Sequence, residues 1–446
     1  MHCYFAADGD DQGGGIVMTS HRRVVVTGMG IVSAFGTHLD IFWQRLCAGE
    51  SAIKPLEFED NGTLPVKYAA RIDFDALLAE NAAYLPQAGM TDKRGVMGMI
   101  AAAKALEDAG LNPLPLAGNP MGIYGCSGVS ELSEDDRHQW RKRDGNGDSQ
   151  QTMQTLFGLR HHLSPYSGLR CGNDGMVTEI GRRFSLSGPV MNVNAACAGG
   201  THAIGLACQS IKRQEASIML AGGADSVISL HTLIGLKLLG ATAVTEKWGD
   251  RLCRPFDKNR SGLVAGEGGA FLVLESEESA LRRGAKIYAE IKGYGASLDA
   301  YKLTAPHPDG AGAENAIRQA IKESGLHPEQ IDYVNAHGTS TPLNDELETA
   351  VIKRVFGSQP PLVSSTKSML GHWIAAAGAI EAVATVLTVK NQFIPPTINL
   401  ETPDPLCDLD YVPQHGRAVP VQNAITNSFG FGGINSCLVI GGYDEK

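Results

Sequence analysis

Asn192–Gln209 reads NVNAACAGGTHAIGLACQ: the end of a strand, a sharp turn that carries Cys197, and a helix rich in small residues. The same shape returns in Val363–Leu387, VSSTKSMLGHWIAAAGAIEAVATVL. Helices that are small and apolar nearly all round are typical of burial between two layers. We therefore predict two related helices, one from each part of the chain, at the centre of the molecule.

The rest of the chain repeats in the same order. The matching segments are Ala103–Pro113 with Arg318–Pro328, Met121–Gly128 with Ile331–Gly338, and Arg22–Ser33 with Lys286–Ser297. Strands that alternate with helices at this spacing predict α/β layers with mainly parallel sheets. We expect two similar α/β halves, residues 21–275 and 276–446, after a flexible extension at residues 1–20 in which Met18 is a candidate start.

The composition is that of an ordinary soluble globular protein. Of the 446 residues, 43% are hydrophobic and 19% are charged, which supplies an ample core. The formal net charge of -10 argues against nucleic acid as a partner, because phosphate binding requires a basic surface. The basic run Arg141–Arg143 is expected to be a solvated surface segment.

The spacing of the cysteines and the hydropathy pattern indicate the cellular compartment of the protein. The nine cysteines are dispersed, without a CxxC pair or zinc-type spacing, which favours reduced thiols in the cytoplasm and no metal site. No signal-peptide pattern is present in residues 1–20. The most apolar stretch, Trp373–Val389, contains Glu381 and ends at Lys390, so we expect a buried helix and no membrane insertion.

Thr27–Gly36, TGMGIVSAFG, follows an apolar strand as a dinucleotide-binding turn would. Its glycines stand at 28, 30 and 36, which is not the GxGxxG spacing, and no helix start follows cleanly. A nucleotide site is therefore not expected here.

Cys197 stands at the predicted start of a helix. By itself a cysteine is more often a buried structural thiol, but the helix dipole and the exposed N–H groups of a helix start favour a thiolate. Gly199 and Gly200 leave room for a substrate and for close backbone packing. Cys208, further along the same helix, is expected to be a core residue.

Two histidines follow strands in the second half. His337 ends IDYVNAHG and His372 ends SSTKSMLGH, and a lone histidine in either place would usually be structural. Sites gather at the carboxyl ends of parallel strands, and the internal repeat makes the second-half turn face Cys197. A cysteine with two converging histidines supports nucleophilic thiol chemistry. Lys367 and Glu381 form either a buried functional pair or a purely structural one.

Asn427–Ser436, NSFGFGGINS, is too rich in glycine for an ordinary strand. One interpretation is a tight hairpin or bulge. The other is a loop that presents a backbone N–H to a developing oxyanion and places aromatic rings over a substrate entrance.

Together these segments resemble a known family. NAACAGG, NAHGTSTPLND, SSTKSMLGH with AAGAIE, NSFGFGG, and RPFDKNRSGLVAGEGG at Arg254–Gly269 are similar in sequence and order to the β-ketoacyl-[acyl-carrier-protein] synthases, most closely the elongating synthase II type. The resemblance extends from about Arg22 almost to the C-terminus. It implies the thiolase fold, in which two related halves form a five-layered αβαβα sandwich.

The resemblance also implies roles. Cys197 would be the nucleophile that takes an acyl chain from acyl carrier protein as a thioester. His337 and His372 would assist decarboxylation of malonyl-acyl carrier protein and stabilise the enolate. Lys367, paired with Glu381, would orient that site.

Further residues would bind and position the substrate. The backbone N–H groups of the nucleophile and of Phe431 would form the oxyanion hole, and Phe429 and Phe431 would gate the site. Thr339 and Thr341 would hydrogen-bond the phosphopantetheine arm, and Val129 would sit beside the acyl pocket. The arm arrives on the carrier protein, so no metal or cofactor is implied, while a homodimer is.

Some positions depart from the family. Ile434 stands where threonine is usual, Glu131 where glycine is frequent, and Ser261 where aspartate is common, and Ser164–Met176 is unlike the usual stretch. These departures bear on which acyl substrate the protein uses and not on the class of reaction. Because the carrier protein is acidic, a local basic rim is needed, and Lys93 and Arg94 are candidates for it, or else ordinary charges at a helix start.

Four functions fit these observations. The first is decarboxylating condensation of acyl and malonyl thioesters in fatty-acid elongation. The second is a specialised polyketide or polyene synthase with the same mechanism. The third is a non-catalytic partner that resembles a chain-length factor, against which Cys197 counts because such partners lack the nucleophile. The fourth is a Cys-His hydrolase.

Overall fold

The computed structural model describes residues 22–56, 66–85, 92–111, 120–128, 174–245 and 247–445. Several sequence predictions fall outside these ranges, namely those for the extension at residues 1–20, Val129, Glu131, Arg141–Arg143 and most of Ser164–Met176.

The described elements fall into two series. The first half contains β1 (Val24–Val32), α1 (Leu39–Ala48), β2 (Lys54–Pro55), β3 (Tyr68–Ala69), α2 (Phe74–Asn81), η1 (Ala82–Tyr84), α3 (Lys93–Asp108), β4 (Gly122–Cys126), α7 (Gly175–Arg183), β5 (Val190–Asn192), η2 (Ala196–Ala198), α8 (Gly199–Lys212), β6 (Ile218–Ser226), α9 (Leu230–Leu238), η3 (Gly249–Arg251), β7 (Glu267–Ser276) and α10 (Glu277–Arg282). The second contains β8 (Ala289–Leu298), α11 (Ala311–Ser324), η4 (Pro328–Gln330), β9 (Tyr333–Asn335), α12 (Pro342–Phe356), β10 (Leu362–Ser364), α13 (Lys367–Leu370), η5 (Ile374–Ala376), α14 (Ala377–Asn391), β11 (Phe393–Ile394), β12 (Arg417–Ala418), β13 (Asn423–Gly430), η6 (Phe431–Gly433) and β14 (Ile434–Gly441).

The main sheet repeats one strand order twice. Its order is β10-β9-β13-β14-β8-β1-β7-β6-β4-β5, so each half contributes five strands in matching sequence. The two halves join through a short antiparallel pairing in which Val25 and Val26 of β1 lie opposite Glu290 and Ala289 of β8. The internal repeat seen in the sequence is therefore a structural repeat.

The prediction of mainly parallel sheets is wrong. In the first half β4 pairs parallel with β5 and β6, but β7 runs antiparallel to both β6 and β1. The second half repeats this arrangement with β9, β10, β13, β14 and β8. Helical crossovers give the parallel pairs, whereas the last strand of each half returns from the opposite end, as in the β13–β14 hairpin.

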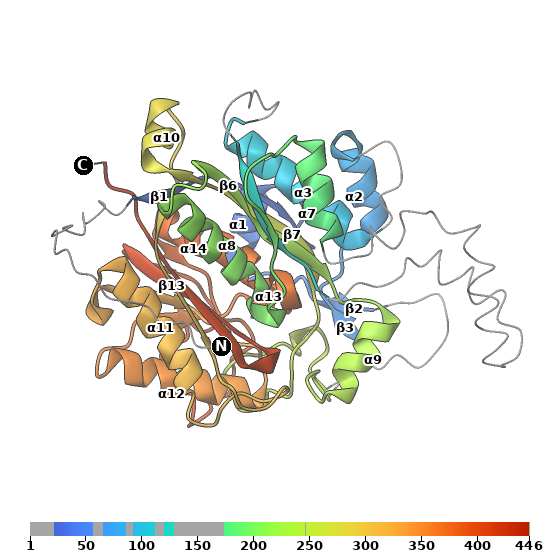
Figure 1. Ribbon diagram of the computed structural model, residues 1–446. Coiled ribbons are helices and arrows are strands. Elements are labelled where there is room, and N and C mark those ends of the chain that lie inside the picture. The colour runs from blue at the N-terminus through green and yellow to red at the C-terminus, as the bar shows by residue number, and fades with distance from the viewer. Residues whose placement is uncertain are drawn as a thin grey trace, which may run out of the picture.

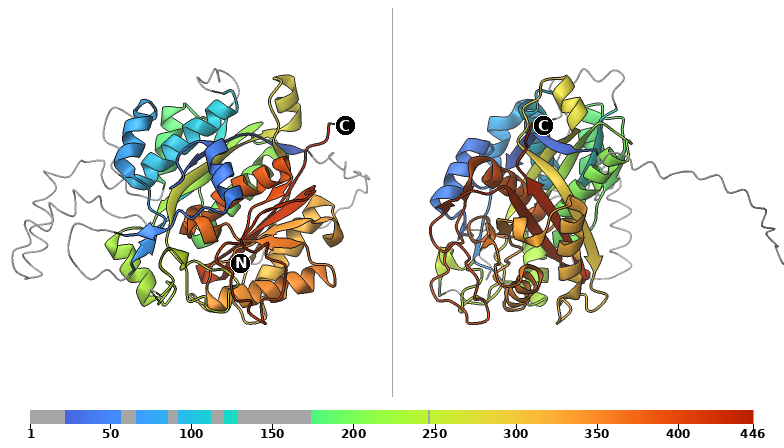
Figure 2. Two further views of the ribbon diagram at one scale, coloured as in Figure 1. Left: turned by 180° about the vertical axis from the view of Figure 1, so that it is seen from behind. Right: turned by 90° about the vertical axis from the view of Figure 1, so that its left-hand side faces the viewer.

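Figure 1 shows the layers that result. Helices α3 and α7 cover one outer face, α11 and α12 cover the other, and α8 and α14 lie side by side between the two halves of the sheet. The view from behind in Figure 2 gives the same order of layers. The predicted five-layered α/β sandwich is confirmed.

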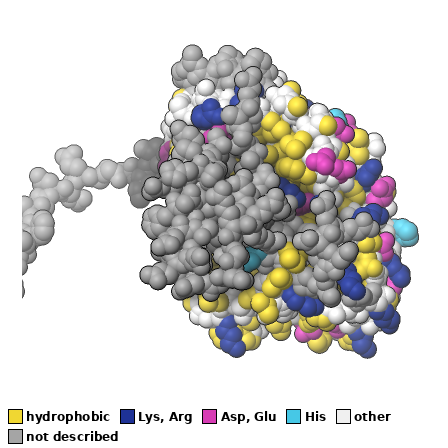
Figure 3. Space-filling view, turned by 90° about the vertical axis from the view of Figure 1, so that its right-hand side faces the viewer, with side chains coloured by type: hydrophobic (Ala, Val, Ile, Leu, Met, Phe, Trp, Pro, Cys, Tyr) yellow, Lys and Arg dark blue, Asp and Glu magenta, His cyan; other side chains and the backbone are white. Residues whose placement is uncertain are grey.

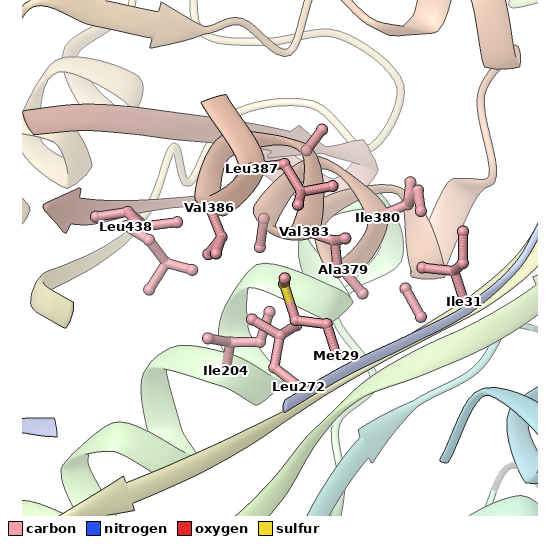
Figure 4. Packing of buried hydrophobic residues seen from close by; sticks show 14 of the residues in the cluster. Met29, Ile31, Ile204, Leu272, Ala379, Ile380, Val383, Val386, Leu387 and Leu438 are labelled. Carbon is pink, nitrogen blue, oxygen red and sulfur yellow. The ribbon is translucent and has the colours of Figure 1, made fainter. Parts of the chain in front are cut away.

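The two central helices approach closely at glycines in matching positions. A Cβ on Gly200 would lie 2.4 Å from the backbone nitrogen of Ala379, and one on Gly378 would lie 2.0 Å from Oγ1 of Thr201. Figure 4 shows the surrounding core, in which Ile204 of α8 and Val383 of α14 belong to one hydrophobic cluster. The close backbone packing predicted at Gly200 is therefore confirmed, while the room for a substrate stays a prediction.

Gly200→Ala is expected to lower the free energy of unfolding by about 1–3 kcal/mol, because the added methyl group overpacks a rigid contact. Thermal denaturation measures the change. Gly235→Ala in α9 is the matched control: a Cβ there meets no atom within 4 Å, so Gly235→Ala should be neutral or stabilising. Equal melting temperatures for wild type and Gly200→Ala would contradict the close contact.

The glycines of Thr27–Gly36 also serve packing. A Cβ on Gly28 would lie 2.4 Å from the carbonyl oxygen of Ala105, and one on Gly30 would lie 2.1 Å from that of Ala101. They let α3 lie directly on β1. The chain then turns sharply, with a Ser33–Gly36 bridge, before α1 begins.

One helix in the described ranges, Ile374–Asn391, is long and apolar enough to cross a membrane, but 83% of it is buried. It comprises η5 and α14, so the prediction of a buried helix at Trp373–Val389 is confirmed.

On the face shown in Figure 3, the described Lys and Arg side chains are interspersed with Asp and Glu and form no single basic patch.

Candidate active site

Two sharp turns of the same form lie at the centre of the molecule. Ala196 in η2 and Ile374 in η5 each have φ 44°, a left-handed conformation that is rare for residues other than glycine. Each turn directly precedes a central helix, α8 or α14, so Cys197 and Ala375 occupy matching positions. Residues held in such strained conformations cluster at functional sites.

Cys197, His337 and His372 meet there. Their Sγ and ring nitrogen atoms lie within 4.8 Å of one another, and all three residues are buried. The two imidazole rings stand edge to face, with centroids 5.4 Å apart. Cys197 comes from η2 in the first half, His337 from the loop just after β9 and His372 from the turn after α13. The predicted convergence of these three side chains is confirmed.

Lys367 and Glu381 form a buried ion pair beside this cluster, in which Nζ donates to Oε1 of Glu381. Burial raises the pKa of Glu381 to about 7, although the ammonium group of Lys367 opposes the rise. The same Nζ lies 3.4 Å from Nδ1 of His337. An ammonium group only donates, so this contact makes Nδ1 an acceptor and places the ring proton on Nε2.

The surroundings fix His372 as a neutral hydrogen-bond donor. The backbone N–H of Ile374 donates to Nδ1 of His372 at 3.2 Å, so a neutral ring must carry its proton on Nε2. Burial, and then the charge of Lys367, hold the pKa of His372 well below its usual value. Burial also lowers the pKa of His337, with contributions from Lys367 and His372.

Three donors in one cluster could also hold a metal ion, because a cysteine and two histidines are common ligands of zinc. The charge of Lys367, which lies 3.4 Å from His337, disfavours a second cation here. The low pKa that burial, and then this ammonium, give both histidines instead suits a pair of neutral donors.

Glu348 of α12 completes the site, and the sequence analysis did not identify it. Its two carboxylate oxygens accept the backbone N–H groups of His337 and Gly338, both at 2.8 Å, and Oε1 also accepts from Nδ2 of Asn427 at 3.1 Å. Burial raises its pKa. Glu348 lies in an acidic helical segment that resembles a solvated surface, so its burial could not be read from the sequence.

The thiol of Cys197 differs from the sequence prediction. A helix start was expected to favour the thiolate, but burial raises the pKa of Cys197 to about 11. A hydrogen bond from the backbone of Phe431 and the charge of Lys367 act in the opposite direction and are outweighed. The helix α8 begins only at Gly199, beyond the cysteine, so loss of hydration dominates over the dipole.

Alkylation of Cys197 by iodoacetamide is therefore expected to accelerate about tenfold per pH unit from pH 7 to pH 10 without a plateau, because only the thiolate reacts. Peptide mass spectrometry at each pH follows this cysteine separately from the others. A plateau at or below pH 8 would show that the resting residue is a thiolate.

The glycine-aromatic segment forms the β13–η6–β14 hairpin. A Cβ on Gly430 would lie 3.1 Å from the backbone nitrogen of Cys197, so glycine allows this close approach. The backbone of Phe431 makes a hydrogen bond to the thiol of Cys197, and so does the backbone of Cys197 itself. Two backbone N–H groups therefore face the sulfur. Phe429 is buried, with its ring centroid 5.8 Å from that of His337. The interpretation as a tight hairpin is confirmed, and the hairpin lies against the sulfur of Cys197; its role toward an oxyanion and a substrate entrance stays a prediction.

The two predicted arm-binding threonines follow His337. Oγ1 of Thr339 and Oγ1 of Thr341 lie 2.8 Å apart, and Thr341 also caps α12 by accepting the N–H of Asn344 at 3.4 Å. Two positions that depart from the family lie in the described ranges: Ile434 is partly buried at the start of β14, and Oγ of Ser261 is buried without a hydrogen-bond partner.

Arg94 is not part of a basic rim. Its side chain is buried, pairs with Asp92 at 2.5 Å and donates to the carbonyl oxygen of Gly128 at 3.0 Å. Lys93 lies with Nζ 5.5 Å from the centroid of the Phe74 ring. The interpretation of Arg94 as part of a basic rim is therefore wrong, because its guanidinium group is paired with Asp92 inside the fold.

Comparison with known proteins gives a consistent result. Residues 21–280 match the family Beta-ketoacyl synthase, N-terminal domain, and residues 288–401 match Beta-ketoacyl synthase, C-terminal domain. The chain is similar to 3-oxoacyl-[acyl-carrier-protein] synthase 2 of Synechocystis sp., with 40% identity over 95% of this chain and 98% of that protein. The protein of the same name from Coxiella burnetii is 38% identical over 94% of this chain and 98% of its own length.

Two solved structures share the fold. One is a type II polyketide synthase acyl-carrier protein in complex with its ketosynthase bound to the hexaketide, with a TM-score of 0.83, 31% identity and coverage of 95% of this chain and 100% of that one. The other is the ishigamide ketosynthase/chain length factor, with a TM-score of 0.82, 35% identity and the same coverage.

Proposed function

The chain belongs to the β-ketoacyl synthase family, and we propose that it joins an acyl chain held on Cys197 to the two-carbon unit of a malonyl thioester on acyl carrier protein. The product is a 3-oxoacyl thioester and the process is fatty-acid elongation. The observation that carries the proposal is the convergence of one thiol, two neutral imidazoles and the Phe431 backbone in a buried cluster.

The first step is transfer of the acyl chain. The sulfur of Cys197 attacks the thioester carbonyl, the bond to the arriving thiol breaks, and the proton of Cys197 balances the one taken up by the leaving sulfur. A thiol suits this role because it forms and releases thioesters readily. The backbone N–H groups of Cys197 and Phe431 stabilise the tetrahedral oxyanion, and Thr339 and Thr341 bind the phosphopantetheine arm.

The second step is loss of CO₂ from the malonyl group. The carbon–carbon bond to the carboxylate breaks, and its electron pair forms an enolate on the thioester. Nε2–H groups of His337 and His372 donate to the enolate oxygen, each worth about 2.7–4 kcal/mol by analogy with other oxyanion holes. Lys367, held by Glu381, keeps the first of these rings in the donor tautomer.

The third step forms the new carbon–carbon bond. The enolate carbon attacks the acyl carbonyl on Cys197, the oxyanion again lies against the two backbone N–H groups, and collapse expels the cysteine sulfur, which takes up a proton. No metal or further cofactor enters this sequence. The rings of Phe429 and Phe431 gate the pocket in this proposal.

The proposed partner is acyl carrier protein, supported by the solved neighbour in which an acyl-carrier protein is bound to its ketosynthase. We place the enzyme in the cytoplasm as a homodimer, without membrane insertion. Arg94 does not supply the basic rim that an acidic carrier protein requires, so other basic side chains form it in this proposal.

A specialised polyketide or polyene synthase is the second candidate. It is favoured by the likeness to a type II polyketide ketosynthase and to the ishigamide ketosynthase/chain length factor, and by Ile434 in the hairpin. Its reaction steps are identical and only the acyl chain differs. The presence of Cys197 disfavours a non-catalytic partner, and a Cys-His hydrolase would release free acid without malonyl-carrier protein.

The deciding experiment incubates the enzyme with malonyl-acyl carrier protein and saturated acyl-carrier proteins of increasing length, beside a polyunsaturated acyl-carrier protein. Mass spectrometry of the carrier follows a gain of the two-carbon unit. Extension of the saturated series supports fatty-acid elongation, and extension of the polyunsaturated chain alone supports the second candidate. Release of free acid without condensation would overturn both.

A further inference from the structure

Asp225, at the end of β6, is a buried carboxylate with no direct role in the steps above. Its Oδ2 accepts the backbone N–H of Ala375 at 2.9 Å, and its Oδ1 accepts that of Ser226 at 2.9 Å. A Cβ on Gly128 would lie 2.5 Å from Oδ2, so the loop after β4 also packs directly on the carboxylate. Asp225 thus links the first half of the fold to η5 of the second half.

The residue that Asp225 holds is part of the strained turn. Ala375 follows Ile374, a β-branched residue at φ 44°, and such a conformation persists only where its surroundings fix it. Both backbone polar groups of Ala375 bond to the first half, because Sγ of Cys126 donates to its carbonyl oxygen at 3.1 Å. Ile374 in turn donates its N–H to Nδ1 of His372.

We propose that Asp225 is a positioning residue for His372. By holding Ala375 it keeps Ile374 in the left-handed conformation in which the Ile374 N–H reaches Nδ1, and this fixes the Nε2–H form of the ring that faces the reactive cluster. The proposal rests on the proposed function, since it assigns Asp225 to the decarboxylation step that His372 serves. At the equivalent turn the close neighbour is Gly430, on which a Cβ would lie 3.1 Å from the backbone nitrogen of Cys197.

A positioning role and a purely structural role of Asp225 predict different effects on the two partial reactions. A structural role would lower both, whereas a positioning role affects mainly decarboxylation. The backbone of His372 is fixed independently, since its N–H donates to the carbonyl oxygen of Val264 at 2.7 Å and its carbonyl accepts from Gly266 at 3.0 Å. Loss of Asp225 should therefore leave His372 in place while its ring loses the partner that selects the tautomer. Acyl loading, which uses Cys197 and Phe431, should be affected much less than decarboxylation.

The test measures the two partial reactions separately in Asp225→Asn, which keeps the shape but loses one acceptor. We expect CO₂ release from malonyl-acyl carrier protein to fall about tenfold or more, because small displacements of a catalytic group have effects of this size. Formation of the acyl thioester on Cys197, followed by intact mass, should stay within the same order of magnitude. In protein labelled with ¹⁵N-histidine, the ring nitrogen shifts of His372 should move away from the Nε2–H pattern.

Asp332→Asn is the matched control. Oδ2 of Asp332 accepts the backbone N–H groups of Gln422 and Asn423 at 2.7 and 3.0 Å, at the end of β9 away from the site. Asp332→Asn should change stability without changing the ratio of the two partial rates. If Asp225→Asn does not fold, Asp225→Glu, which keeps a carboxylate displaced by one methylene group, is expected to show the same selective loss.

The outcomes separate the two proposals. A wild-type enzyme that performs neither partial reaction contradicts the proposed function itself. A wild type that performs both, with Asp225→Asn lowering both equally or neither, and with unchanged His372 shifts, overturns the positioning role.

Discussion

Cys197→Ala is expected to abolish condensation, with a loss of about 10⁴-fold or more, because removal of a covalent nucleophile eliminates the pathway and leaves only binding and the oxyanion hole. The acyl adduct on the protein should disappear at the same time. Intact mass after incubation with acyl-acyl carrier protein measures the adduct, and carrier mass measures the condensation product. Stability should change little, because the substitution removes only one buried sulfur atom.

Cys208→Ala is the matched control for this prediction. Cys208 lies on α8, is as deeply buried as Cys197 and donates only a weak bond to the carbonyl oxygen of Ile291 at 3.8 Å. Its replacement should leave the adduct and the turnover intact. Condensation that persists in Cys197→Ala would remove the nucleophile assignment, and loss of activity in both variants would point to a packing defect of α8.

Replacing both histidines by alanine is expected to give the second large effect. Each neutral Nε2–H donor is worth about 2.7–4 kcal/mol, or roughly 10²–10³-fold in rate, so His337→Ala and His372→Ala should each strongly slow CO₂ release. The double variant should lose less than the product of the two, because the donors act on one oxygen. Acyl loading of Cys197 should survive in all three, because the thiol proton is balanced by the leaving sulfur.

The depressed pKa of both rings adds a sharper expectation. Because burial and Lys367 keep them neutral, they act as donors across neutral pH, and an asparagine that supplies a neutral N–H should retain more activity than alanine. His327→Ala, an exposed histidine before η4, is the control and should behave as wild type. Normal CO₂ release by the double alanine variant would remove the assigned role.

Much of the fold was predictable because it repeats. The pairs of matching segments identified two halves and two central helices, and the structure places α8 and α14 between the layers. The direction of β7 and β14 was not predictable, since hydrophobic runs in buried strands do not differ between parallel and antiparallel pairing. Close packing at Gly200 was expected, but its partner Ala379 was not, because a glycine in a sequence does not reveal the atom that faces it.

The candidate site, like the fold, was predictable only in part. The residue types at Cys197, His337, His372, Lys367 and Glu381 follow from motifs that are local in the chain, and so does the class of reaction. Glu348 and Asp225 could not be found this way, because no local motif marks the backbone N–H groups that their carboxylates accept. In a sequence, a buried acidic residue looks the same as a solvated one.

The sequence by itself determined which reactive side chains are available for the proposed chemistry, because a thiol, two imidazoles and an ion pair are properties of particular residues in recognisable order. Only the tertiary structure decided their ionisation and tautomers. Cys197 is a thiol and not the predicted thiolate because folding removes it from water, and His372 is an Nε2–H donor because Ile374 is held beside it. Desolvation and backbone hydrogen bonds arise from residues distant in the chain, so they exist only once the two halves have met.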